Sequence, residues 1–306
     1  MATVSEPRRA QRKSAVTRGL SPLGRRSQPR RRGGMKPRPN YIAGIFSLVW
    51  LVIILAPIYV LVKGSFQTQS EFSSQGPLAI PHHLTLNTYH RVIKSGFLHY
   101  FVNSGIITAG TVLIVVLLAP PAAYAIVRNQ GRIVGVVFRI LLMGLAVPAT
   151  VVVVPLFYLF HKVGLYDSLL GVILPTAAFA LPICTIILTG AMRDVTRELY
   201  EAMALDGANS WKVFRSLVLP LSKGGIATIV VFSALQGWNG FIFPLILIQS
   251  SSKQAFTLAL YNFQVNNDVD VPAIAGAVVL SMVPILLVYL FGRSWLIKGL
   301  MGVGGK

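Results

Sequence analysis

The sequence predicts an all-α integral membrane protein with six transmembrane helices. Of its 306 residues, 54% are apolar and only 12% are charged, whereas soluble domains average roughly 25% charged residues. Six apolar stretches contain no Asp, Glu, Lys or Arg. Each can supply the roughly 20 residues that cross a hydrocarbon core of ~30 Å. This composition excludes a typical water-soluble enzyme.

The six apolar stretches are the predicted transmembrane helices. A charge at the centre of such a helix costs roughly 2.5 to 3.5 kcal/mol, so the lack of charge in all six is a strong constraint on the sequence. The predicted spans are residues 41–62, 100–127, 140–161, 168–192, 224–252 and 271–292.

The distribution of Lys and Arg predicts the orientation. With the N-terminus inside, the inner segments hold 23 basic residues and the outer segments hold five, so both termini are expected to be cytoplasmic. Residues 1–40 carry 12 of these bases, a single acid, and no apolar periodicity, which predicts a disordered tail. Such a tail could bind anionic lipid or nucleic acid. An orientation signal is the simpler interpretation, and we expect no nucleic-acid partner.

The histidine and cysteine residues give little support for a metal centre. The single cysteine, Cys184, excludes an intrachain disulfide and a cysteine-based zinc site. The outer loop before the second span contains four histidines whose spacing fits no helical or strand face. A surface loop is therefore the favoured interpretation over a membrane-bound metalloenzyme. These histidines are His82, His83, His90 and His99.

Motifs for catalysis and for energy conversion are missing. The closest string to a phosphate-binding loop, GVGGK, ends the chain at Lys306 without a following Ser or Thr. The spans also lack the embedded acids and bases that ion-gradient transporters commonly use. We therefore predict that the chain is not an enzyme, has no catalytic residue and binds no cofactor or metal itself. The alternative is a secondary transporter or channel, which would work without ATP.

The inner loop between the fourth and fifth spans is predicted to form two short helices. It contains four of the nine acidic residues of the chain. We expect Asp194 to cap the first helix and Gly207 to end it, because glycine adopts the left-handed C-cap conformation without a Cβ penalty. We expect Asn209 or Ser210 to cap the second helix and Pro220 to stop it.

Both of these helices are predicted to be amphipathic. Two amphipathic helices joined at a glycine bend would protrude from the membrane and suit docking into a groove on another protein. A helical hairpin lying on the membrane surface is equally compatible with the amphipathicity. The apolar residues of the two helices are Leu199, Tyr200 and Met203, then Trp211, Phe214 and Leu217.

The string EAMALDGANSWKVFRSLVLP resembles the EAA loop of bacterial ATP-binding-cassette (ABC) importer permeases. The family pattern reads EAA, three residues, Gly, nine residues, Ile, one residue and Leu-Pro. Met203 and Leu217 depart mildly from this pattern. The five positions that match at the family spacing are Glu201, Ala202, Gly207, Leu219 and Pro220.

This resemblance implies the type I ABC importer permease fold over residues 41–298, with cytoplasmic tails at 1–40 and 299–306, in a bacterial cell membrane. It implies three kinds of partner: a second homologous permease, an ABC ATPase dimer that binds ATP and Mg, and an extracytoplasmic solute-binding protein. The chain would form half of the translocation pathway and couple to the ATPase through residues 193–222. The implied coupling residues are Glu201, Ala202, Asp206, Gly207, Trp211, Phe214, Leu219 and Pro220.

Two further strings are similar to the maltose-type branch of this family. They are ALDGA at 204–208 and GWNGFIFPLIL at 237–247, in which Gly240 stands where relatives usually have an acid. The similarity implies a sugar cargo, although glycerol-phosphate or another polar solute fits the same pattern. It also implies that the outer loop around Ser251 to Phe256 faces the solute-binding protein.

Four residues near the middle of the fifth predicted span are candidates for the translocation pathway. An indole face suits a sugar ring, and amides suit its hydroxyl groups. The alternative is that these side chains join the spans by interhelical hydrogen bonds. The four candidates are Ser233, Gln236, Trp238 and Asn239, and weaker ones are Asn103, Tyr124, Tyr158 and Thr185.

Overall fold

The computed structural model describes residues 41–81, 83–129, 131–265 and 268–301. The chain divides into two units, residues 1–49 and residues 50–306. In the first unit, residues 41–49 are described and are helical. The predicted basic tail lies outside the described residues. The second unit holds the packed helices.

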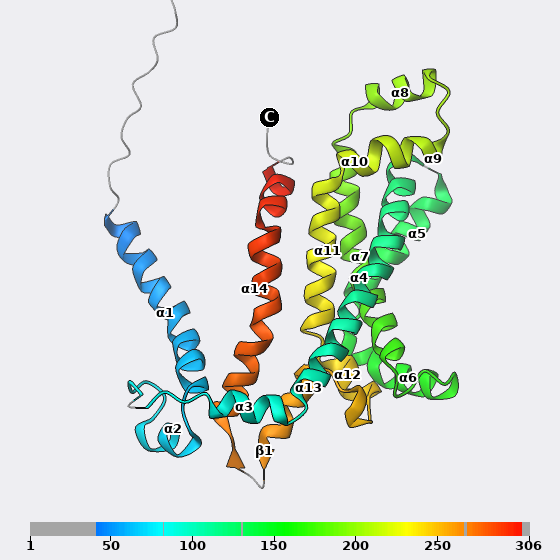
Figure 1. The fold of residues 1–306 in the computed structure, drawn as a ribbon. Helices are drawn as coiled ribbons and strands as arrows, with labels where there is room; N and C mark the ends of the chain where they lie inside the picture. The colour runs from blue at the N-terminus through cyan, green and yellow to red at the C-terminus, as the bar shows by residue number, and fades with distance from the viewer. Residues whose placement is uncertain (1–40, 82, 130, 266–267, 302–306) are drawn as a thin grey trace, which may run out of the picture. The chain divides into compact units, whose positions relative to one another are not determined.

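The described structure is almost entirely helical (Figure 1). Its strands form one short antiparallel ladder, in which Gln264 pairs with Val269 and Val265 with Asp268. In chain order, the elements are α1 (Tyr41–Ser65), α2 (Gln69–Gln75), α3 (Asn87–Lys94), α4 (Phe97–Arg128), α5 (Arg132–Met143), η1 (Gly144–Ala146), α6 (Ala149–Lys162), α7 (Leu169–Arg193), α8 (Arg197–Leu205), α9 (Ser210–Val213), η2 (Phe214–Val218), α10 (Leu219–Leu221), α11 (Lys223–Trp238), α12 (Ile242–Leu247), η3 (Ser251–Lys253), α13 (Phe256–Ala259), η4 (Leu260–Phe263), β1 (Gln264–Val265), β2 (Asp268–Val269) and α14 (Val271–Met301).

The core lies between α4, α7 and α11, which pack side by side (Figure 1). Small residues on these helices let their backbones approach closely. At Gly237 of α11, a Cβ atom would lie only 2.8 Å from the Cα of Thr108 on α4. Cys184 is fully buried, as its apolar setting predicts. Other residues buried in this core include Val115, Ala119, Ala123, Ala177, Ala180, Leu188 and Ile229.

Within the described residues, α1, α4 and α7 are long and apolar enough to cross a bilayer. Two bent pairs raise the number of candidate spans to five if each pair counts as one. The helix of residues 132–146 meets α6 at 104°, and the helix of residues 210–221 meets α11 at 76°. A shorter apolar helix covers Val271–Leu287 of α14.

Two of the predicted spans are not continuous helices. The stretch 140–161 is interrupted before Pro148, where Val147 is extended because a residue that precedes proline avoids the helical conformation. The stretch 224–252 is interrupted between α11 and α12. There the carbonyl of Gly240, four residues before Pro244, accepts a hydrogen bond from the Thr257 hydroxyl at 2.8 Å, so the proline costs no helical bond at this break.

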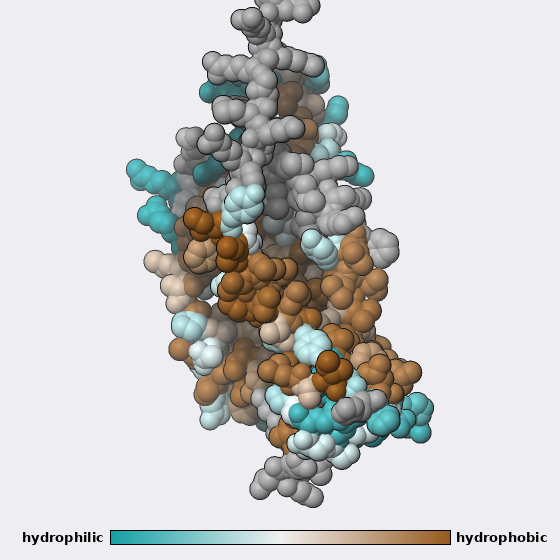
Figure 2. Space-filling model, turned by 90° about the vertical axis from the view of Figure 1, so that its left-hand side faces the viewer, coloured by the Kyte–Doolittle hydropathy of each residue, from teal (hydrophilic) through white to brown (hydrophobic). Residues whose placement is uncertain are grey.

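The second unit exposes a large apolar surface on α1. Every large apolar side chain from Trp50 to Tyr59 is at least 43% exposed. Figure 2 shows hydrophobic residues gathered over the middle of one face, with hydrophilic residues below them. Contiguous apolar surface of this extent is typical of contact with lipid or with a protein partner.

The two ends of the core helices carry different kinds of segment (Figure 1). Residues 193–222, with α8, η2 and α10, lie at one end, which we call the inner end. Residues 163–168 and 248–255 lie at the opposite end, which we call the outer end. These names follow the orientation predicted from the Lys and Arg distribution.

Candidate functional site

The inner segment, by which we mean residues 193–222, begins where α7 ends. Asp194 is the C-cap of α7, and α8 begins at Arg197 with Thr196 as its N-cap. The prediction that Asp194 caps α8 is therefore wrong, because α7 continues to Arg193 and a short turn separates the two helices. In the first turn of α8, the backbone N–H of Glu198 and then the Thr196 side chain lower the pKa of the Glu198 carboxyl. A negative charge is favourable at this end of a helix.

Gly207 ends α8, as predicted, with a φ of +69°. The N–H of Gly207 donates to the carbonyl of Ala204 at 3.0 Å, and the N–H of Ala208 donates to the carbonyl of Met203 at 3.0 Å. This pair of bonds is a Schellman motif. Apart from its two chain neighbours, no described residue has an atom within 4 Å of the position that a Cβ would take. Glycine is therefore favoured here by the backbone conformation and not by lack of space.

Asn209 caps the second helix. Its Oδ1 accepts a hydrogen bond from the N–H of Lys212 at 2.9 Å, which makes Asn209 the cap and Ser210 the first helical residue. Contrary to the prediction, Pro220 does not itself end this helix, because α10 continues to Leu221. The helix widens into a π-turn, η2, which ends at Val218, two residues before the proline. A wider turn relieves the clash between a proline ring and the carbonyl four residues before it.

Buried aromatic residues attach the inner segment to α4. Tyr200 is 6% exposed, and the Arg128 guanidinium lies over its ring, 4.5 Å from the centroid. Phe214 is also buried, with its ring centroid 5.2 Å from that of Tyr124, whose hydroxyl donates to the Ser210 carbonyl at 3.3 Å. Burial raises the pKa of the Tyr200 hydroxyl, which has no hydrogen-bond partner among the described residues. A displacement of α8 or η2 therefore reaches α4 by direct contact.

The other side of the inner segment is exposed. Leu205 is 90% exposed and Trp211 is 65% exposed. Glu201 and Arg197 form an exposed ion pair, with 2.7 Å between Oε1 and Nε, and such a pair contributes little stability. A pocket of about 330 Å³ lies between the end of α4 and α8, lined by Val127, Arg128, Arg197, Tyr200, Glu201 and Ala204.

The structure divides the eight predicted coupling residues by exposure. Phe214 is buried and Leu219 is partly buried, so both lie on the side that faces the helix bundle. Their contribution is to fix the segment in place. The six exposed residues are Glu201, Ala202, Asp206, Gly207, Trp211 and Pro220.

Two of the four predicted translocation residues lie together. Gln236 and Asn239 are both exposed and line one pocket of about 200 Å³. The Asn239 Nδ2 donates to the Leu235 carbonyl at 3.1 Å, which fixes the direction of the amide. Aromatic rings and one hydroxyl group complete the lining, which consists of Ala149, Thr176, Phe179, Gln236, Asn239, Gly240, Phe241, Ile242 and Phe243.

The other two predicted translocation residues are buried away from this pocket. The Ser233 hydroxyl donates to the Ile229 carbonyl at 2.6 Å, within α11. The Trp238 Nε1 donates to the Ser281 carbonyl of α14 at 3.2 Å. Its ring packs against Phe101, with centroids 4.9 Å apart. The Trp238 contacts join helices to one another, which is the alternative that the sequence leaves open, whereas the Ser233 bond stays within one helix.

The weaker candidates are scattered through the fold. Tyr124 lies at the inner end, against Phe214. Thr185 donates within α7 to the Leu181 carbonyl at 2.8 Å, and Tyr158 is 70% exposed. Asn103 lies at the outer end, where it contacts a loop.

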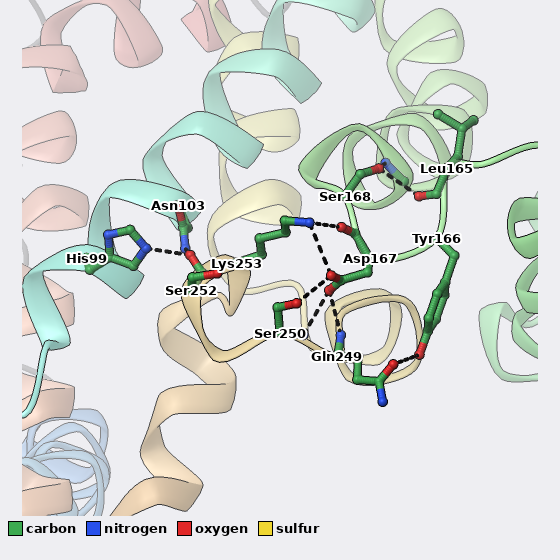
Figure 3. Close-up of polar contacts among 11 residues, drawn as sticks. His99, Asn103, Leu165, Tyr166, Asp167, Ser168, Gln249, Ser250, Ser252 and Lys253 are labelled. Atoms are coloured by element: carbon green, nitrogen blue, oxygen red, sulfur yellow. Dashed lines mark hydrogen bonds and ion pairs between the residues drawn. The ribbon is translucent and has the colours of Figure 1, made fainter.

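A polar cluster around Asp167 at the outer end was missed in the sequence (Figure 3). Its carboxylate accepts hydrogen bonds from the N–H groups of Gln249 and Ser250, both at 2.9 Å, and from the Ser250 hydroxyl at 2.5 Å. The Lys253 Nζ lies 3.1 Å from Oδ2 and 2.6 Å from the Asp167 carbonyl. The Ser250 hydroxyl and N–H hold the pKa of the Asp167 carboxyl well below its usual range, with smaller effects from Gln249 and Lys253.

Residues 248–255, which we call the outer loop, are held by Asp167 on one side and by α4 on the other (Figure 3). The Asn103 Nδ2 donates to the carbonyls of Ser252 and Gln254, both at 3.0 Å. A ring nitrogen of His99 also contacts the Ser252 carbonyl. In the sequence, the partners of Asp167 and Asn103 are more than 80 residues away, so no local pattern marks this cluster.

The described residues contain no group of three or more His, Cys, Asp or Glu side chains that could hold a metal ion. Of the four histidines before the second predicted span, His82 lies outside the described residues. His99 contacts the Ser252 carbonyl, as described above, and the main-chain N–H of His83 donates to the Glu71 carboxylate at 3.2 Å.

Comparison with known proteins places these observations in a family. Residues 116–300 match the family model of the binding-protein-dependent transport system inner membrane component. The diacetylchitobiose uptake system permease NgcG of Streptomyces coelicolor is 31% identical and aligns over 79% of this chain and 81% of its own length. The multiple sugar-binding transport system permease MsmG of Streptococcus mutans is 32% identical over 81% of this chain and 91% of its own length.

The fold is also shared with a solved structure. A bacterial ABC transporter involved in import of the acidic polysaccharide alginate contains a chain that superposes with a TM-score of 0.71. The match covers 84% of this chain and 97% of that chain, at 23% sequence identity. This similarity shows the type I ABC permease fold. The chain therefore belongs to the family of binding-protein-dependent transport system inner membrane components, which are the non-enzymatic permease subunits of ABC importers.

Proposed function

We propose that this chain forms half of the translocation pathway of an ATP-driven sugar importer, paired with a second homologous permease. Sugars are proposed because NgcG and MsmG are named for sugar uptake. We further propose that residues 41–298 cross the membrane six times, with both tails in the cytoplasm. The imbalance of 23 inner to five outer basic residues supports this orientation.

The inner segment, residues 193–222, is the proposed docking site for the ABC ATPase dimer. The observation that carries this proposal is its two-sided construction. Tyr200 and Phe214 are buried against the bundle, whereas Leu205 and Trp211 are exposed on a segment that also carries the EAA pattern. Large exposed apolar residues beside a pocket are typical of anchors in protein interfaces.

The proposed mechanism is alternating access driven from this segment. ATP and Mg would be bound by the partner subunits, and closure of the ATPase dimer would displace α8. Because Arg128 and Tyr124 contact the inner segment directly, that displacement would be passed to α4 and the rest of the bundle. Coupling requires a difference in contact free energy between two states, and this packed junction can supply one.

The pocket that contains Gln236 and Asn239 is the proposed contact with cargo inside the membrane. Its amide groups can bond to sugar hydroxyls, while Phe179, Phe241 and Phe243 offer apolar faces to a sugar ring. Trp238, which also belongs to the proposed pathway, would act from behind this pocket by fixing α11 against α14. Ser233, the fourth proposed residue, would act within α11 itself.

Site-specific crosslinking tests the docking site and the orientation together. Cys184 is fully buried, so an introduced cysteine would be the accessible thiol in the described part of the chain. In the complex purified by a tag on this chain, Leu205→Cys should crosslink to the ATPase. Leu84→Cys, at a site that is 73% exposed near the outer end, is the matched control and should not crosslink.

The same pair of variants gives the orientation in intact cells. A membrane-impermeant maleimide should label Leu84→Cys and leave Leu205→Cys unlabelled until the cells are opened. Labelling in the reverse order would overturn the proposed orientation. Absence of any ATPase crosslink from Leu205→Cys, in a complex that hydrolyses ATP, would overturn the proposed docking site.

Reconstitution separates this function from transport driven by an ion gradient. The complex is reconstituted in proteoliposomes with the ATPase on the inside, and the solute-binding protein is added outside. Labelled sugar should accumulate in these vesicles only when they contain ATP. Uptake by this chain alone, driven by a proton or sodium gradient, would contradict the proposal.

A further inference from the structure

We propose that Asp167 is a positioning residue that holds residues 248–254 as a preformed contact surface for the solute-binding protein. This inference rests on the proposed function of a binding-protein-dependent importer, and on the expectation from the sequence that the loop around Ser251 to Phe256 faces the solute-binding protein. The inference goes beyond the proposed function by assigning a role to Asp167, which is far from the loop in sequence. Asp167 would affect the partner only by fixing the loop that the partner contacts. Asp167 itself lies in the short turn between α6 and α7.

The first support is the number of bonds that converge on Asp167. Its carboxylate accepts from two N–H groups, one hydroxyl and one ammonium group, and its own N–H donates to the Leu247 carbonyl at 2.9 Å. These partners come from both sides of the point where α12 ends and the outer loop begins. A carboxylate that accepts several bonds from one short loop fixes the path of that loop.

The second support is the backbone of Asp167. Its φ of +52° is the one positive φ at a non-glycine position in the part of the chain that the structure describes. Aspartate and asparagine tolerate this left-handed conformation better than other residues with a Cβ. A residue kept in such a conformation is held by its tertiary contacts. Here those contacts are with Leu247 at the end of α12 and with the outer loop that follows it.

The third support is that the loop is braced from two directions. Asn103 on α4 holds the carbonyls of Ser252 and Gln254, whereas Asp167 holds the loop at Gln249, Ser250 and Lys253. Except for the single turn of η3, residues 248–255 have no regular structure. Ordering such a segment costs conformational entropy. With the two braces in place, this cost is met before any partner arrives.

The surface that the loop presents is small and polar. Gln249, Ser251 and Ser252 are exposed, and the charge of Lys253 is balanced by Asp167. A partner would therefore meet hydroxyl and amide groups with fixed directions and little net charge. This surface suits hydrogen bonding to a protein that must bind and leave in each transport cycle.

The test measures how the solute-binding protein stimulates ATP hydrolysis by the complete complex in lipid nanodiscs. The binding protein of the same transport system is titrated in its sugar-loaded form. Asp167→Gly removes the side chain and keeps the positive φ accessible. We expect the half-maximal concentration of binding protein to rise about tenfold or more, with ATPase activity in the absence of binding protein within about twofold of the wild type.

Two further variants weaken the contacts between Asp167 and the outer loop by smaller steps, and with Asp167→Gly we call them the clamp variants. Asp167→Asn keeps an acceptor oxygen and tolerance of the left-handed conformation but removes the charge, and Lys253→Met removes the other half of the ion pair. Both should give smaller increases of about two- to fivefold. If the Asp167→Gly complex fails to assemble, these two variants decide the question by the same titration.

Asp270→Asn is the matched control. Asp270 lies at the start of α14, has the same side-chain exposure as Asp167, 21%, and forms an ion pair with Arg91. Its substitution should leave the half-maximal concentration unchanged. An equal increase in Asp270→Asn, or no increase in any of the Asp167 and Lys253 variants, would overturn the positioning role.

The outcomes also distinguish this inference from the proposed function. If the wild-type complex is not stimulated by the solute-binding protein at all, the proposed function fails. If the wild type is stimulated and the clamp variants respond identically to it, only the positioning role fails. A fall in thermal stability without a change in half-maximal concentration would show that Asp167 stabilises the fold and nothing more.

Discussion

The inner and outer segments of this permease are built from opposite kinds of interaction. The inner segment, residues 193–222, is held by buried aromatic and aliphatic side chains and exposes the large apolar residues Leu205 and Trp211. The outer loop, residues 248–255, is held by a carboxylate, an amide and an ammonium group, and exposes small polar side chains.

This difference matches the two kinds of partner proposed for the two ends. Permanent interfaces are more hydrophobic than transient ones. Exposed Leu205 and Trp211 suit a subunit that stays bound, whereas a rigid polar loop suits a protein that dissociates after each delivery. The two segments also differ in what should disrupt them: loss of packing at the inner end, and loss of charge at the outer end.

The largest effect on stability is expected from removing the buried ring of Tyr200, which packs the inner segment against α4. Tyr200→Ala removes a buried ring and should destabilise the complex by about 3 kcal/mol, whereas Tyr200→Phe should be neutral or slightly stabilising because the buried hydroxyl has no described partner. Thermal unfolding of the purified complex measures both. Equal destabilisation by the two substitutions would show that the hydroxyl, and not the packing, holds the junction.

A smaller effect on stability, with a large effect on coupling, is expected at Gly207. Gly207→Val forces a β-branched residue to adopt a φ of +69°, at a cost of about 1 to 2 kcal/mol. The end of α8 should then shift, and sugar uptake should fall while ATP hydrolysis continues. Gly207→Asn, which tolerates this conformation, should retain most of the uptake. Normal uptake by the valine variant would argue against a coupling role for this bend.

The smallest effect is expected from acid at the outer end. The pKa of the Asp167 carboxyl is lower in the folded protein than in the unfolded chain. Its contribution is therefore fully present above the unfolded pKa and is lost as the pH falls toward the folded pKa. The difference in melting temperature between the wild type and Asp167→Asn should stay constant from about pH 8 to pH 5 and shrink below about pH 4. A difference that grows on acidification would contradict this sign.

The sequence predicts the local features of the inner segment well. Gly207 at the end of α8 and Asn209 as the cap of the next helix follow from residue types whose backbone preferences act within a few residues. Asp194 was misplaced because capping depends on where α7 stops, and apolar packing extends that helix to Arg193. Membership of the permease family was predicted from the EAA pattern and is confirmed by the family match.

Features that depend on the direction of a helix or side chain, or on contacts between residues far apart in the sequence, were not predicted. Apolar composition predicts a membrane span at residues 140–161 but does not reveal the 104° bend between the two helices there. The Asp167 cluster joins residues more than 80 positions apart, so its members look unrelated in the sequence. Likewise, Trp238 and Asn239 are adjacent in the chain, yet one is buried against α14 and the other lines an open pocket.

The contact between Gly237 and Thr108 limits how the bundle can move. Because a Cβ at position 237 would lie 2.8 Å from the Thr108 Cα, the two helix axes are as near as their main chains permit. Insertion of even one methyl group at this crossing would force the two helices apart. We therefore expect α4 and α11 to stay in contact at this point in every state of the transport cycle, with larger relative displacements confined to parts of the two helices further from it.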